Sequence, residues 1–167
     1  MRSQKPVATG GLIPGNIALH AIDNLSWPLL IIPPGTKFRQ IRRTVLACDF
    51  KEIPESIPFE PIKSLVTEFR SHLYVLHINK MNESLNVIAF SDEFKRLREV
   101  MSDLHPVYRF SCNTDINGAI NAFVEKNNFD LLILLPKKHY TPEKAYYKSY
   151  SRQLALHLNT PILSLHK

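Results

Sequence analysis

Two polar side chains lie at the ends of apolar segments of strand length, where α/β sheets bind ligands. Asp49 ends the run 44–48, and His77 comes near the end of the run 73–78. Ligands of open α/β sheets bind at the carboxyl ends of the strands. A carboxylate there can hold a ligand, whereas capping a helix or ordering a loop is the structural alternative for Asp49. For His77 the sequence favours a buried, hydrogen-bonded imidazole.

Cationic side chains concentrate in two segments of a chain whose formal net charge is +6. The first group precedes the first strand of the main domain and consists of Lys37, Arg39, Arg42 and Arg43. The second lies toward the C-terminus and consists of Lys137, Lys138, Lys144, Lys148 and Arg152. Such charge attracts nucleotides, nucleic acid or lipid headgroups. Because no recognised nucleic-acid module accompanies it, a solvated basic surface is the expected interpretation.

The sequence has no pattern typical of a catalytic or metal centre. The seven histidines form no His-x3-His pair and do not pair with the two cysteines. No Gly-x-Ser-x-Gly elbow is present. Cys48 and Cys112 are too few for a disulfide framework, and Cys112 is expected to be a small buried apolar residue. We therefore expect no enzyme activity and no metal.

Length and composition are those of a globular domain. The 167 residues are 44% hydrophobic and 22% charged, which excludes a disordered chain. No apolar run approaches the roughly 20 residues that cross a bilayer, and the first residues lack the apolar core of a signal peptide. The expected location is the cytoplasm.

Strands and helices alternate along most of the chain. The predicted strands are 44–48, 73–78, 107–110, 130–135 and 162–165. The predicted helices begin near Pro58, Ser91, Thr114 or Asp115, and Thr141. This order predicts a doubly wound, Rossmann-like five-stranded parallel sheet with helices on both faces. The very apolar run 130–135 is expected at the centre and the alternating run 107–110 at an edge. Helical spacing predicts one buried face from Phe59 to Phe69.

The chain begins with the pattern with which it ends. The segments 15–32 and 148–165 each combine a helix-length stretch, a proline and an apolar strand, and they align without a gap. In this register Leu30 falls on Leu163 and Ile32 on Leu165. A repeat of this kind indicates one complete unit preceded by the final helix and strand of a sister unit.

The order and spacing of these segments resemble the universal stress protein family. The resemblance rests on Val45–Phe50, Tyr74–Ile78, Asp130–Leu134, and Ser149 followed by Pro161. It covers residues 42–167 as a whole domain and residues 15–33 as the tail of a second. The domain division that follows is residues 1–34, the remnant of a first unit, and residues 35–167, a complete unit. The resemblance implies a non-enzymatic role in the stress response.

Nucleotide-binding members of the family carry a loop of the form Gly-x2-Gly-x9-Gly-Ser/Thr after the fourth strand. Its bare backbone approaches the phosphates closely and donates N–H groups to them. Here the three glycine positions fall on Leu135, Lys138 and Lys148, and only Ser149 is retained. The resemblance therefore implies no cofactor held by a glycine loop.

Two alternatives remain open. In the first, ATP or AMP binds through the positions that the resemblance assigns to nucleotide contacts, which are Asp49, Ile78, Lys138, Lys148 and Ser149. The lysines would then serve as mobile point charges for phosphate. In the second, the chain is a dimerisation or scaffolding module with no small ligand.

The resemblance also implies how the repeat is used. In tandem and dimeric members the final strands of two units meet in antiparallel fashion. The equivalent strands here, 28–32 and 162–165, are both apolar, and an exposed apolar edge invites aggregation. We expect them to pair antiparallel, within one chain or by exchange between two. The first helix would leave apolar residues uncovered, so a homodimer is expected.

Overall fold

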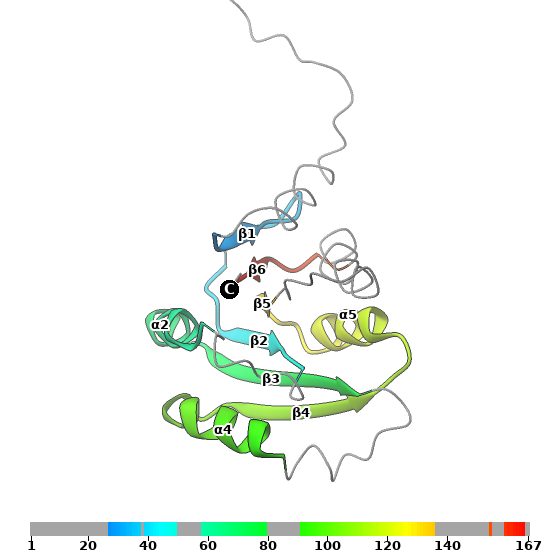
Figure 1. Ribbon diagram of the computed structural model, residues 1–167. Helices are drawn as coiled ribbons and strands as arrows, with labels where there is room; N and C mark the ends of the chain where they lie inside the picture. Colours follow the sequence, from blue (N-terminus) through cyan, green and yellow to red (C-terminus); the bar gives the residue numbers. More distant parts are fainter. Residues whose placement is uncertain are drawn as a thin grey trace, which may run out of the picture.

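The computed structural model describes residues 27–37, 39–49, 58–79, 91–135, 154 and 159–165. In these residues six strands form one sheet, in the order β1-β6-β5-β2-β3-β4 (Figure 1). The strands are β1 (Leu29–Ile31), β2 (Arg43–Ala47), β3 (His72–Asn79), β4 (Val107–Cys112), β5 (Leu131–Leu134) and β6 (Ile162–Ser164). Strands β2 to β6 are mutually parallel, and β1 is antiparallel to β6. The predicted fold is confirmed, including β5 inside the sheet and β4 at its edge.

Three α-helices and a short 3-10 helix are described. They are α2 (Phe59–Phe69), α4 (Asp92–Val100), η2 (Ser102–Leu104) and α5 (Ile116–Lys126). Two predicted caps are confirmed, because Ser91 accepts a hydrogen bond from the backbone N–H of Phe94 and Asp115 accepts one from that of Gly118. Such caps satisfy N–H groups that the first helical turn leaves unpaired. The helices predicted near Gly15 and Thr141 lie outside the described residues, apart from Leu154, which is helical.

The sheet is covered on both faces, because successive strand residues point to opposite sides. Leu46 and Ile133 pack into one core cluster with residues of α2 and α4. Val45 and Leu132, their neighbours in sequence, pack into a second cluster with residues of α5. Figure 1 shows α2 and α4 on one side of the sheet and α5 on the other. Burial of all four side chains of β5 explains why its sequence is continuously apolar.

Asp130 joins the starts of the two central strands. Its Oδ2 accepts hydrogen bonds from the backbone N–H groups of Arg42 and Arg43, each at 2.9 Å. Its own N–H donates to the carbonyl of Arg43 at 2.9 Å. The Arg43 guanidinium lies 5.0 Å from the ring centroids of both Tyr74 and Phe129, a distance typical of cation–π contact. These contacts hold the register of β2 against β5 from the amino end.

Two expectations about burial are wrong. Phe69, which helical spacing places on the buried face, is 40% exposed. It is the last residue of α2, and the left-handed conformation of Arg70 directly after it ends the helix, so no further turn covers the ring. Cys112 is exposed rather than buried, because it is the last residue of the edge strand β4.

The strand pairing expected from the repeat is confirmed within one chain. β1 pairs antiparallel with β6, with Leu29 opposite Ser164, Leu30 opposite Leu163 and Ile31 opposite Ile162. β1 therefore covers the edge of β6 and is itself the outermost strand on that side of the sheet.

Candidate functional site

The strand order changes direction between β2 and β5. From β2 the chain adds β3 and β4 on one side, and it then returns to add β5 and β6 on the other. Open α/β sheets bind ligands outside the carboxyl ends of the strands at this kind of switch point. Asp49 lies just beyond the carboxyl end of β2, and Leu135 directly follows β5. The structure thus places Asp49 at the carboxyl edge of the switch point.

The side chain of Asp49 lies near His77 of the neighbouring strand β3. The Nδ1 atom of His77 lies 3.9 Å from Oδ1 of Asp49 and 3.2 Å from the carbonyl oxygen of Cys48. A carbonyl oxygen only accepts hydrogen bonds, so Nδ1 of His77 carries the proton. The imidazole is 3% exposed, whereas the Asp49 side chain is 39% exposed. The buried, hydrogen-bonded histidine is confirmed, and Asp49 keeps an accessible face.

Ile78 lies on the neighbouring strand end but faces the other side of the sheet from His77. It is half-buried and packs against the core cluster that includes residues of α5. Asn79 follows it, is 1% exposed and accepts a 2.9 Å hydrogen bond from the backbone N–H of Asn113. Asn79 was not among the residues predicted from the sequence, although a polar residue directly after an apolar strand is the signal that identified Asp49.

Leu135 occupies the first of the three glycine positions. Its side chain is half-buried and packs against the core cluster that includes residues of α2 and α4. A packed side chain therefore stands where glycine-loop members have bare backbone. The other predicted contacts, Lys138, Lys148 and Ser149, lie outside the described residues. Of the predicted nucleotide contacts, the structure brings Asp49 and Ile78 to adjacent strand ends.

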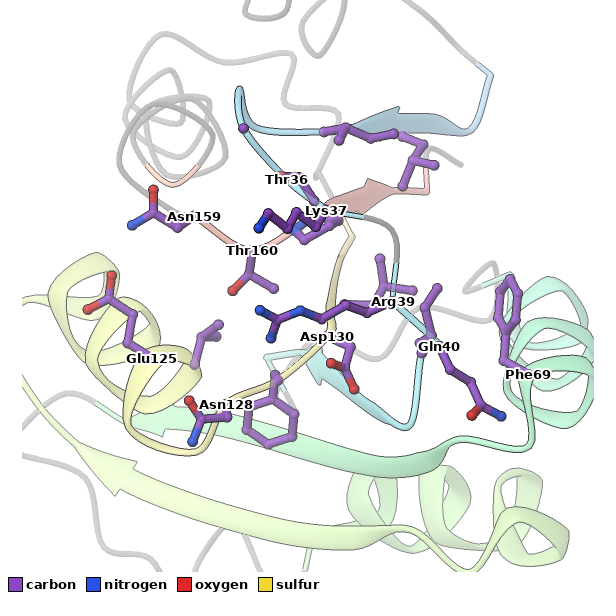
Figure 2. Close-up of a pocket in the computed structure, with 18 of the residues that line it drawn as sticks. Thr36, Lys37, Arg39, Gln40, Phe69, Glu125, Asn128, Asp130, Asn159 and Thr160 are labelled. Carbon is purple, nitrogen blue, oxygen red and sulfur yellow. The ribbon is translucent and has the colours of Figure 1, made fainter.

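A cavity of about 1060 Å³ opens at the opposite, amino-terminal edge of the central strands (Figure 2). Its wall includes Lys37 and Arg39, two of the residues predicted to form a solvated basic surface, together with Asp130 and Thr160. Neither Asp49 nor any other residue of the carboxyl edge lines it. No sequence pattern predicts this cavity, because its walls come from segments far apart in the chain.

Among the described residues, no group of three or more histidine, cysteine, aspartate or glutamate residues is arranged to hold a metal ion. No helix in that part of the chain has the length and apolar character needed to span a membrane.

No protein-family model and no curated protein matches the sequence. Solved structures match its fold. A universal stress protein from Archaeoglobus fulgidus superposes with a TM-score of 0.65 and 13% identity. The chain has the universal stress protein fold. The superposition covers 90% of this chain and 54% of the other, so the chain spans about half the length of that universal stress protein.

Shorter universal stress proteins match along nearly their whole length. One, in complex with cAMP, has a TM-score of 0.58 at 12% identity and covers 77% of this chain and 98% of its own. A second, from Archaeoglobus fulgidus in complex with dAMP, has a TM-score of 0.53 at 11% identity and covers 75% and 98%. At these identities the likeness establishes the fold.

Proposed function

We propose that this chain is a non-enzymatic universal stress protein-like domain that acts in the cytoplasmic stress response without holding ATP through a glycine loop. The observation that supports this most directly is the packing of Leu135 against the core. Backbone N–H groups cradle a phosphate only where the chain can approach it closely, which favours residues without a side chain. A half-buried leucine at the first loop position works against that approach.

Adenine-nucleotide binding through other contacts is the second candidate. Asp49 supports it, because this carboxylate stands at the switch point with 39% of its side chain exposed. Two proteins of the same fold were solved with cAMP and dAMP. In this candidate Asp49 and Ile78 contact the nucleoside, and Lys138, Lys148 and Ser149 contact phosphate.

We also propose that residues 1–34 are the final helix and strand of a first unit and residues 35–167 a complete second unit. The antiparallel pairing of β1 with β6 supports this division. So does the comparison with longer and shorter universal stress proteins, since the longer one covers 90% of this chain and the shorter one 77%. Assembly then occurs through final strands, in a tandem arrangement or in a homodimer.

Isothermal titration calorimetry of the full chain with ATP and with AMP, with and without Mg²⁺, tests the choice between the two candidates. We expect no saturable heat at millimolar nucleotide. Saturable micromolar binding would replace the first candidate by the second, provided that Asp49→Ala abolishes it. Asp103→Ala is the matched control, because that carboxylate is exposed and lies beside α4, far in the sequence from the switch-point residues.

A further inference from the structure

Three of the four exposed large apolar side chains among the described residues line one cavity. Leu30 is 54% exposed, Ile32 61% and Phe69 40%, and all three belong to the wall of the amino-edge cavity of about 1060 Å³. The first two come from β1 and the residue after it, whereas Phe69 ends α2. Exposed apolar residues that gather in one place mark a binding surface, and small-molecule sites are mostly apolar hollows of roughly 300–1,000 Å³. The cavity thus has the size and the apolar wall of a ligand site.

The linker between β1 and β2 places two cations on this wall. Lys37 and Arg39 both line the cavity, and Figure 2 shows their side chains extending toward Thr160. In the described part of the chain, no carboxylate lies within ion-pair distance of either cation. A guanidinium presents a planar fork of donors that matches a carboxylate, and an ammonium adds a compact charge. The two cations are therefore available to an anionic group in the cavity.

The linker is anchored on both sides of these cations. Before them, the N–H of Thr36 donates to the carbonyl of Pro33 at 3.2 Å, and Gly35 has a φ of +77°, as in a type II turn. The hydroxyl of Thr36 donates to the same carbonyl at 2.7 Å. After them, the carboxylate of Asp130 accepts two backbone N–H groups at the start of β2. Both attachments reduce the conformational freedom that the linker would lose when a ligand binds.

The wall also limits the charge of the ligand. Glu125 and Asp130 line the same cavity as Lys37 and Arg39, so the four charged side chains carry no net charge. A polyanion such as a nucleoside triphosphate would meet both carboxylates, and like charges in proximity repel. A single carboxylate can instead bind at the two cations and leave the rest of the cavity to an apolar group. Charge and apolar wall together favour an amphiphile with one anionic head.

We propose that the amino-edge cavity binds a fatty-acid-like amphiphile. Its carboxylate lies against Lys37 and Arg39, and its apolar body covers Leu30, Ile32 and Phe69. Because no residue of the carboxyl edge lines the cavity, the site is separate from the switch point and does not depend on the proposed function.

Isothermal titration calorimetry of the full chain with sodium decanoate, below its micelle concentration, tests the proposal. We expect saturable binding, with clearly weaker binding of 1-decanol, which has the same apolar body without the charge. Arg39→Gln should weaken decanoate binding by about tenfold or more, because a charge-assisted hydrogen bond is lost. Arg109→Gln is the matched control, because it removes an exposed cation of the edge strand β4, outside the cavity. Ile32→Ser should weaken decanoate and 1-decanol alike, since it removes apolar contact.

No saturable heat with decanoate would overturn the proposal. Equal binding of decanoate and 1-decanol, or equal losses in Arg39→Gln and Arg109→Gln, would also overturn it, because the carboxylate would then not be recognised by the cavity. Displacement of decanoate by AMP would contradict a separate site. A dimer in light scattering that Ile32→Ser dissociates and decanoate does not would assign the apolar wall to a second copy. Urea midpoints equal to that of the parent protein show that the variants are folded, and the titrations with ATP and AMP judge the proposed function separately.

Discussion

The imidazole of His77 and the carboxylate of Asp49 lie 3.9 Å apart at the carboxyl edge of the sheet. The imidazole on β3 is buried, whereas the carboxylate that follows β2 is accessible. The hydrogen bond of His77 to the Cys48 carbonyl fixes the ring from the same side. The pair therefore belongs to the architecture of the carboxyl edge at the switch point.

His77→Ala should lower the free energy of unfolding by about 2–4 kcal/mol, because it removes a buried hydrogen bond and leaves a cavity. Urea unfolding measures the change. His72→Ala, on the same strand but exposed, is the control and should stay within about 0.5 kcal/mol of the parent protein. Equal effects at the two positions would contradict the anchoring role of His77.

Asp130→Ala should lower the free energy of unfolding by about 2 kcal/mol, because the carboxylate accepts two backbone N–H groups at the start of β2. Asp130→Asn should cost less, since an amide oxygen can still accept. Asp103→Ala is the matched control, because its side chain is 84% exposed and its ion pair with Lys63 is long, at 4.0 Å. The urea midpoint should be lowest for Asp130→Ala, higher for Asp130→Asn and highest for Asp103→Ala. An Asp130→Ala variant with the stability of the parent protein would show that the hydrogen bonds of Asp130 do not stabilise the start of β2.

Leu135→Gly alone should destabilise the domain by about 2–3 kcal/mol, because it removes a packed side chain and adds backbone freedom to the unfolded state. Glycine at positions 135, 138 and 148 together should raise ATP affinity in calorimetry, if Asp49 and the rest of the crevice remain intact. No gain in affinity by a folded triple variant would mean that the crevice has diverged elsewhere.

Tyr108 should make stability fall in alkaline solution. Burial raises the pKa of its phenol above the ordinary value of 10.0, and nearby Arg98 acts weakly in the opposite direction. The folded state thus favours the neutral phenol. The contribution of this group to the free energy of unfolding is fully present below the pKa of the unfolded state and is lost as pH rises through the pKa of the folded state. Tyr108→Phe keeps the edge-to-face contact with Phe94 and should flatten the loss of urea stability between about pH 9 and 11. Parallel pH profiles of the two proteins would refute this.

The sequence predicted most of the fold, because its patterns report local burial. The uninterrupted apolar run of β5 predicted its place inside the sheet, and the alternation in β4 predicted its place at the edge. Ser91 and Asp115 predicted the starts of α4 and α5. The repeat predicted the antiparallel pairing of the strands 28–32 and 162–165, which no local pattern contains.

Other features depend on tertiary contacts that no single segment encodes. Helical spacing could not reveal that Phe69 falls at the end of α2, beyond the cover of the next element. The contact of His77 with Asp49 joins two strands, and the amino-edge cavity joins four separate segments of the chain. Such features appear only when the sheet is assembled.

The antiparallel pairing of β1 with β6 also determines how late in synthesis and refolding these two strands can pair. The strands β2 to β5 all lie between its two partners in sequence, so a ribosome must release these strands before Leu30 can meet Leu163. Closing so long a loop carries an entropic cost that local contacts do not, and long-range pairing is correspondingly slow. β1 should therefore dock last in refolding, and pulsed hydrogen exchange should show its amides protected after those of β2 and β3. Until then the edge of β6 stands open, and that interval is when the nascent protein is most exposed to association with other chains.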